Sequence, residues 1–144
     1  MLLISSCITG INCRYNATSS YNKNLLNRIK VEYIHICPEI LAGFTVPRKP
    51  CEIFNGSGED VLNGNAKVID SDGVDVTEKM LFGAKKAIKI CLGNNVIKAY
   101  LQARSPTCGV NKIYDGTFTS TLRNGNGVFS TLLKINKIEV EEVG

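Results

Sequence analysis

The six cysteines are the residues of this chain with the most evident capacity for chemistry. They are spread along its 144 residues, at Cys7, Cys13, Cys37, Cys51, Cys91 and Cys108. Cysteines serve as metal or cluster ligands, as reactive thiols, as disulfides in secreted proteins, or as small apolar core residues. No Cys-x-x-Cys pair occurs, so the strongest signatures of a zinc knuckle or a thioredoxin-like redox site are absent.

The bulk composition favours a reduced, globular protein. Its hydrophobic fraction of 44% and its length predict one domain with one core over residues 1–144. The apolar start, residues 1–4, is too short for a signal-peptide core, and no segment is long enough to cross a bilayer. We therefore expect a cytoplasmic protein without membrane contact, whose cysteines are metal ligands, reactive thiols or core residues rather than disulfides.

The net charge of +4 suits an anionic ligand, such as a nucleotide, better than a cationic one. The chain has no basic stripe with interleaved aromatic residues, which disfavours a dedicated RNA-binding surface. The sequence leaves the oligomeric state open.

Strands and helices alternate along the predicted structure. From the hydrophobic patterns we expect strands at 2–6, 31–36, 96–101 and 138–143, and helices at 22–29, 77–92 and after 127. Thr77 is the expected N-cap and Gly93 the C-cap of the longest helix. Residues 46–73 are interpreted as a long functional loop with a small β excursion at 67–69, and Asp115 with Gly116 as a hairpin turn. This order predicts an α/β fold with a mainly parallel sheet flanked by helices.

Three cysteines follow predicted strand ends. Cys7 comes after the first strand, Cys37 after the second, and Cys108 lies in the loop after the third. Ligands of open α/β sheets bind beyond the carboxyl ends of the strands. We therefore expect these three cysteines to converge at one edge of the sheet.

Four ordered segments resemble the DUF523 family, which includes the small thiouracil desulfidases. They are Cys7-Ile8-Thr9-Gly10 with Cys13-Arg14-Tyr15-Asn16, then Cys37-Pro38-Glu39, then Pro47-Arg48 with Pro50, Glu52 and Ile53, and finally Ser105-Pro106-Thr107-Cys108-Gly109. Each motif alone is weakly specific, but the ordered set spans nearly the whole chain. Two departures stand out: Asn16-Ala17 replaces the usual Asp-Gly, and Thr107 replaces a serine.

The resemblance implies a [4Fe-4S] cluster held by Cys7, Cys37 and Cys108, with Cys13 as a possible additional ligand. It further implies Glu39 as the acid/base group and Ser105 as a residue that holds or activates the substrate. With three protein ligands, one iron stays open to a soft thiocarbonyl sulfur. The implied reaction is a non-redox desulfuration of a thiolated pyrimidine, a small-molecule thiolated base, to the carbonyl base and sulfide.

Other interpretations compete at single residues. Cys91 lies on the apolar face of a predicted helix and reads as a core residue, and Cys51 as structural. Glu39 also suits a helix start, and Ser105 a turn or cap. His35, the only histidine, is interpreted as a core or edge residue.

Three alternative functions stay open from the sequence. The same chemistry would also remove sulfur from a thiolated nucleotide within RNA. A thiol or iron–sulfur redox module would cycle Cys7 and Cys13 through a disulfide. A non-catalytic metal-binding protein would use a cluster or zinc for stability alone.

Overall fold

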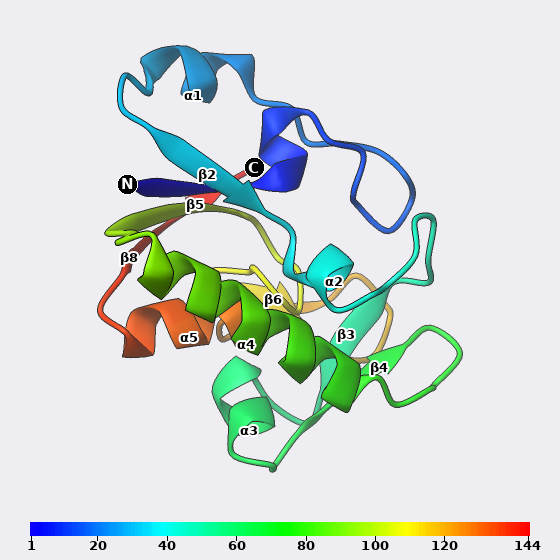
Figure 1. The fold of residues 1–144 in the computed structure, drawn as a ribbon. Helices are drawn as coiled ribbons and strands as arrows, with labels where there is room; N and C mark the ends of the chain where they lie inside the picture. Colours follow the sequence, from blue (N-terminus) through cyan, green and yellow to red (C-terminus); the bar gives the residue numbers. More distant parts are fainter.

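A four-stranded parallel sheet forms the centre of the protein, in a computed structural model that describes all 144 residues (Figure 1). Its strand order is β2-β1-β5-β8. The strands are β1 (Leu2–Ser5), β2 (Tyr33–Ile36), β5 (Lys98–Gln102) and β8 (Glu139–Val143). Every neighbouring pair is parallel, which confirms the predicted α/β fold with a mainly parallel sheet.

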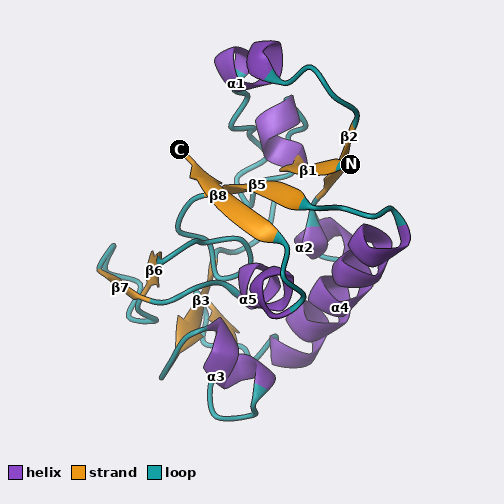
Figure 2. Cartoon of the chain, turned by 90° about the vertical axis from the view of Figure 1, so that its left-hand side faces the viewer, coloured by secondary structure: helices purple, strands orange, loops and turns teal.

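The two faces of the sheet bury different sets of side chains. Leu3 and Ile4 are neighbours in β1, so their side chains point to opposite faces of the sheet. Both are fully buried, which means that both faces are covered. Leu3 belongs to the main core and Ile4 to a smaller cluster around the first loop. The helices α4 (Thr77–Gly93) and α5 (Val128–Ile135) cover the first face, and α1 (Lys23–Arg28) lies on the other (Figures 1 and 2).

Helix α4 forms where the sequence predicts it, because one face is apolar. Its buried side chains include Met80, Ala84 and Cys91. Its caps differ from the prediction: Val76 is the N-cap and Asn94 the C-cap. The Thr77 hydroxyl instead accepts a hydrogen bond from the backbone N–H of Val68 at 3.0 Å, which ties the helix start to a neighbouring strand.

The region 46–73 is more regular than the predicted loop. It contains β3 (Cys51–Phe54), α3 (Gly58–Leu62) and β4 (Lys67–Asp70), and β3 pairs with β4 in antiparallel fashion. Helix α3 begins with a capping box in which Ser57 and Asp60 satisfy each other's backbone N–H groups. The predicted β excursion is thus one half of a hairpin whose other strand, β3, carries Cys51.

A second hairpin joins β6 (Lys112–Tyr114) to β7 (Leu122–Asn124). The predicted hairpin at Asp115 and Gly116 is present, but its connection is a longer loop, 115–121, that begins with these two residues. The Glu52 carboxylate anchors this loop by accepting the backbone N–H groups of Gly116 and Phe118 at 2.9 and 3.2 Å. The loop is therefore held both by Glu52 of β3 and by its own ends, where the Asp115 N–H donates to the Thr121 carbonyl at 2.9 Å.

None of the helices combines the length and the apolar character that crossing a bilayer requires.

Candidate active site

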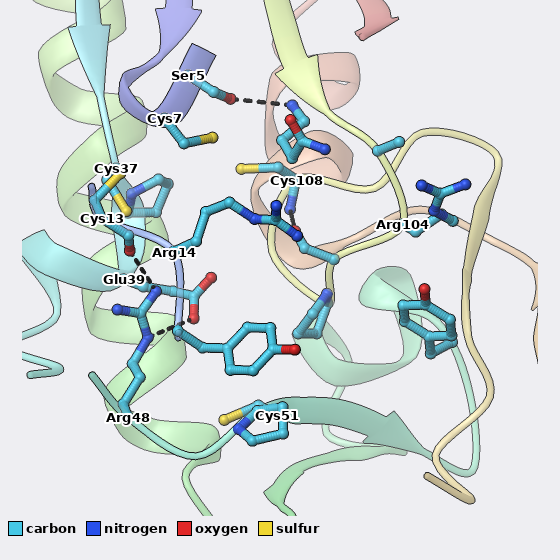
Figure 3. Close-up of a pocket in the computed structure, with 18 of the residues that line it drawn as sticks. Ser5, Cys7, Cys13, Arg14, Cys37, Glu39, Arg48, Cys51, Arg104 and Cys108 are labelled. Carbon is cyan, nitrogen blue, oxygen red and sulfur yellow. Dashed lines mark hydrogen bonds and ion pairs between the residues drawn. The ribbon is translucent and has the colours of Figure 1, made fainter. Parts of the chain in front are cut away.

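A pocket of about 370 Å³ opens at the carboxyl edge of the parallel sheet (Figure 3). Five cysteines line it together with Glu39, namely Cys7, Cys13, Cys37, Cys51 and Cys108. Its volume lies within the range of small-molecule sites. The predicted convergence of Cys7, Cys37 and Cys108 at one edge is therefore present in the fold.

The sheet topology explains why these cysteines meet. Strand β1 lies between β2 and β5, so the connections that leave β1 and its two neighbours surround one point, where ligands bind in such sheets. Cys7 lies in a 3-10 helix, Ser6–Thr9, directly after β1. Cys37 directly follows β2 and is the N-cap of α2 (Pro38–Leu41). Cys108 comes from the loop after β5.

The loop that carries Cys108 is fixed by the start of helix α5. The first N–H groups of a helix lack partners inside the helix, and here loop carbonyls accept them. Val128 donates to the Pro106 carbonyl and Phe129 to the Thr107 carbonyl, both at 2.9 Å. A Cβ at Gly127 would lie 2.4 Å from the Thr107 carbonyl carbon, so the approach requires glycine at this position.

Ser105 caps the same loop. Its hydroxyl oxygen accepts the backbone N–H of Cys108 at 2.7 Å, and its carbonyl accepts that of Gly109 at 2.9 Å. Ser105 thus has the capping role that the sequence offered as an alternative to a role in substrate binding. Since its oxygen acts as the acceptor in this bond, the hydroxyl proton is left to donate into the pocket that Ser105 lines.

Glu39 is held by two side chains. Its Oε1 accepts a hydrogen bond from Arg48 Nε at 3.2 Å, and its Oε2 accepts one from the Thr107 hydroxyl, also at 3.2 Å. The Arg48 side chain is only 6% exposed and Glu39 17%. Arg48 also donates to the carbonyl of Cys13 at 2.9 Å and to that of Thr45 at 3.2 Å. The carboxylate therefore has a fixed orientation at the pocket wall, where Figure 3 shows it beside the Arg48 guanidinium.

Three of the pocket cysteines, Cys13, Cys37 and Cys108, resist ionisation as free thiols. Contact with Cys37 lowers the pKa of Cys13, but contact with Cys7 and burial outweigh this and raise it to about 11. Contact with Cys13, together with burial, raises the pKa of Cys37. Burial, and then the charge of Cys37, raise the pKa of Cys108. Thiolates in such a group require a compensating cation, and metal binding supplies one while releasing the protons.

The remaining cysteines occupy distinct places. Cys91 is fully buried in the main core, which confirms the prediction for it. Cys51 is buried in the pocket wall, and burial raises its pKa to about 12. Cys13 lies beside Cys7 and Cys37 and is 4% exposed. His35 is exposed on the edge strand β2, and its Nδ1 lies 3.0 Å from the Ser6 hydroxyl.

Three further residues in or beside the pocket make contacts, or lack them, in ways that the sequence did not reveal. The sequence motifs contain Arg48 and Thr107 but do not reveal that both bind Glu39. Gln102 lines the pocket, and its buried Oε1 has no hydrogen-bond partner. It is the last residue of β5, so the strand-end argument that found the cysteines would also have found Gln102.

The donor set fits an iron–sulfur cluster in its chemistry. Three cysteine sulfurs from three different segments are soft ligands of the kind that such clusters take, and an unpartnered buried amide, Gln102, lines the same pocket. No three His, Cys, Asp or Glu side chains are grouped as the ligands of a single metal ion. A cluster is a larger body than one ion, and its ligands stand further apart.

An α/β protein with buried cysteines and an oriented carboxylate at the carboxyl edge of its sheet has the architecture of a metallocofactor enzyme. Residues 2–143 match the 2-thiouracil desulfurase family, and the chain belongs to this family. This confirms the resemblance found in the sequence motifs.

Two relatives extend the comparison. The chain is 42% identical over 135 residues to the uncharacterized protein YbbK of Bacillus subtilis (strain 168), covering 93% of this chain and 89% of YbbK. Its fold is similar to the solved structure of the [4Fe-4S]-dependent thiouracil desulfidase TudS, with a TM-score of 0.84 and 31% identity. That match covers 98% of this chain and 89% of the TudS chain.

Proposed function

We propose that this protein is an iron–sulfur-dependent desulfidase that hydrolyses the thiocarbonyl of a thiolated pyrimidine, such as thiouracil, to the carbonyl base and sulfide. The observation that carries the proposal is the grouping of Cys7, Cys37 and Cys108 around the pocket that also holds Glu39. Family membership and the fold shared with TudS support it.

Cys7, Cys37 and Cys108 would hold a [4Fe-4S] cluster, whose iron without a protein ligand would supply Lewis acidity towards the soft thiocarbonyl sulfur. These three residues are the ones that follow β1, β2 and β5, the central strand and its neighbours. Cys13 is not required by this assignment, although it lies in the same pocket.

Glu39 is the proposed general base. Its two oxygens each accept one bond from the protein, and each carboxylate oxygen has room for about two. The remaining positions are available to a water molecule in the pocket. Glu39 removes one proton from this water as the water oxygen bonds to the thiocarbonyl carbon, and then returns this proton to the departing sulfur. The C–S bond breaks as the remaining proton of the added hydroxyl is released to solvent, which leaves the carbonyl base and HS⁻.

Ser105 is the proposed substrate-binding residue. Its hydroxyl oxygen is held by the Cys108 N–H, so the hydroxyl proton is the part that reaches the substrate. That proton can donate to a ring carbonyl oxygen, or to the oxygen of the added hydroxyl as it loses its proton and the C–S bond breaks. The role is compatible with the capping bond because donor and acceptor are different atoms of one hydroxyl group.

The proposed substrate is a small molecule, and the proposed location is the cytoplasm. All six cysteines are unpaired, which suits a reducing compartment. The net charge is modest at +4, so the proposal does not include RNA as the substrate.

Oxygen-18-labelled water tests the reaction. The protein, reconstituted anaerobically with iron and sulfide, is incubated with 4-thiouracil or 2-thiouracil without any electron donor. We expect uracil carrying the label and an equal amount of sulfide. Turnover that requires an added reductant, or unlabelled uracil, would contradict hydrolysis and favour the redox module instead.

A further inference from the structure

The Thr107 hydroxyl is fully buried and has only one strong acceptor within reach. It donates to Glu39 Oε2 at 3.2 Å and also contacts the Met80 sulfur at 3.0 Å. Thr107 itself is 0% exposed. A hydroxyl has one proton, and a bond to a carboxylate is stronger than one to a thioether. The proton is therefore directed to Glu39, and Met80 packs against the oxygen.

The backbone of Thr107 cannot move easily. Its carbonyl accepts the backbone N–H groups of Phe129 and Ser130 at 2.9 and 3.2 Å, and Gly127 packs against it without a side chain. The hydroxyl thus projects from a rigid turn that also delivers Cys108, the next residue. Any change in the position of this turn moves the cluster-binding loop and the Glu39 partner together.

Arg48 provides the second fixed contact. It donates to Glu39 Oε1, the carboxylate oxygen that Thr107 does not contact, and it is anchored by the carbonyls of Cys13 and Thr45. With one donor on each oxygen, the carboxylate plane is set by two groups that come from different parts of the fold. Neither group is free to rotate away, since both side chains are buried.

We infer that Thr107 is a positioning residue for the catalytic carboxylate, acting with Arg48 to fix where the Glu39 oxygens face the pocket. The inference rests on the proposed function, in which Glu39 is the general base. Misplacing a catalytic group by about 1 Å costs roughly a hundredfold in rate. Losing one of the two contacts that orient Glu39 should therefore lower kcat, while the KM for the substrate changes little.

The test compares two variants of the reconstituted full-length protein. Thr107→Val keeps the shape of the side chain and removes the hydroxyl, whereas Thr107→Ser keeps the hydroxyl. We expect T107V to retain its iron and its KM for 4-thiouracil but to lose roughly tenfold to a hundredfold in kcat. We expect T107S to stay within about threefold of wild type. Ser130→Ala removes another fully buried hydroxyl, one without a partner, and should leave kcat unchanged.

A crystal structure of each variant supplies a readout that does not depend on activity. We expect the Glu39 carboxylate to rotate away from its wild-type position in T107V and to keep it in T107S. Wild-type kcat in T107V, or an unmoved carboxylate, would overturn the inference. A T107V protein that folds but takes up no iron would also overturn it, because the hydroxyl would then serve the cluster loop.

The proposed function can fail separately. If the wild-type protein takes up iron but releases no sulfide, the desulfidase proposal fails. The position of the Glu39 carboxylate in the T107V and T107S crystal structures then still decides the positioning inference. If T107V does not fold, T107S and Arg48→Lys decide it, since R48K keeps the charge but loses the fork that binds Glu39 and two carbonyls.

Discussion

Two glutamates line the pocket, and their partners assign them different roles. Glu52 is 8% exposed, and its Oε1 accepts backbone N–H groups from the 115–121 loop, so it serves as an anchor for that loop. Glu39 is instead held by the side chains of Arg48 and Thr107. At the scale of single residues, Glu39 is the carboxylate with a fixed orientation and free acceptor positions.

Replacing Glu39 by glutamine should abolish most turnover without loss of the cluster. Glutamine has nearly the same shape but cannot take up a proton from water, and general acid–base catalysis contributes about 10²–10⁴-fold. We expect E39Q to lower kcat in that range while its iron content and absorption spectrum stay as in wild type. Glu59→Gln, on the surface helix α3, is the matched control. An active E39Q would remove Glu39 from the mechanism.

Serine variants separate ligands from neighbouring cysteines. If Cys7, Cys37 and Cys108 hold the cluster, Cys37→Ser should lose most of its iron, because a thiolate is the stronger ligand. Cys13→Ser should keep a full complement, and Cys51→Ser serves as a pocket control. Iron bound per chain after anaerobic reconstitution is the measurement. A loss of iron in C13S equal to that in C37S would make Cys13 a ligand.

At the scale of the elements, the short connections set the geometry of the site more than the strands do. Helix α5 fixes the Cys108 loop through its first N–H groups, and α2 begins at Cys37 itself. The first loop depends on a less favourable conformation, because Ala17 has a φ of 60°. This is the left-handed region, which glycine adopts without a steric cost.

Changing Ala17 to glycine should stabilise the protein slightly. The left-handed conformation costs an L-residue roughly 1–2 kcal/mol, which exceeds the about 0.4–1 kcal/mol that glycine adds to the entropy of the unfolded chain. We expect a net gain of up to about 1 kcal/mol in the free energy of unfolding, measured by urea denaturation. Gly73→Ala, with a φ of +80° and open space around it, should show the opposite sign. A less stable A17G would argue against this loop conformation.

Gly127→Ala should loosen the contact between α5 and the Cys108 loop. The added Cβ would meet the Thr107 carbonyl at 2.4 Å, and such overpacking costs roughly 1–3 kcal/mol. We expect a lower melting temperature and reduced iron retention on exposure to a chelator. Gly93→Ala, which adds a methyl group where nothing lies within 4 Å, should retain iron as wild type does. If G127A retained as much iron as wild type, the position of the Cys108 loop would not control cluster binding.

At the scale of the whole molecule, much of the fold and the grouping of cysteines could be predicted because both depend on local patterns. Buried strands are short apolar runs, and Cys7 and Cys37 follow two of them directly. The strand β3 and helix α3 were missed because prolines and glycines around them resemble a loop. The pairing of Glu39 with Thr107 joins residues 68 positions apart, and no local pattern carries that information.

The same limit applies to the roles of individual residues. Ser105 and Thr107 are two positions apart in one motif, but one caps the loop and the other binds Glu39. Only the position of α5 and α2 around this turn distinguishes them. The sequence therefore predicted which residues group at the candidate site, and the fold defines how their side chains are oriented.

Anaerobic reconstitution with iron and sulfide, followed by an iron count and a sulfide-release assay on thiouracil in one sample, decides whether this protein is a cluster-dependent desulfidase. We expect about four irons per chain, as a cubane cluster requires, and sulfide formed in equal amount to uracil. A protein that takes up no iron, or that releases as much sulfide without the cluster as with it, would contradict the proposed function.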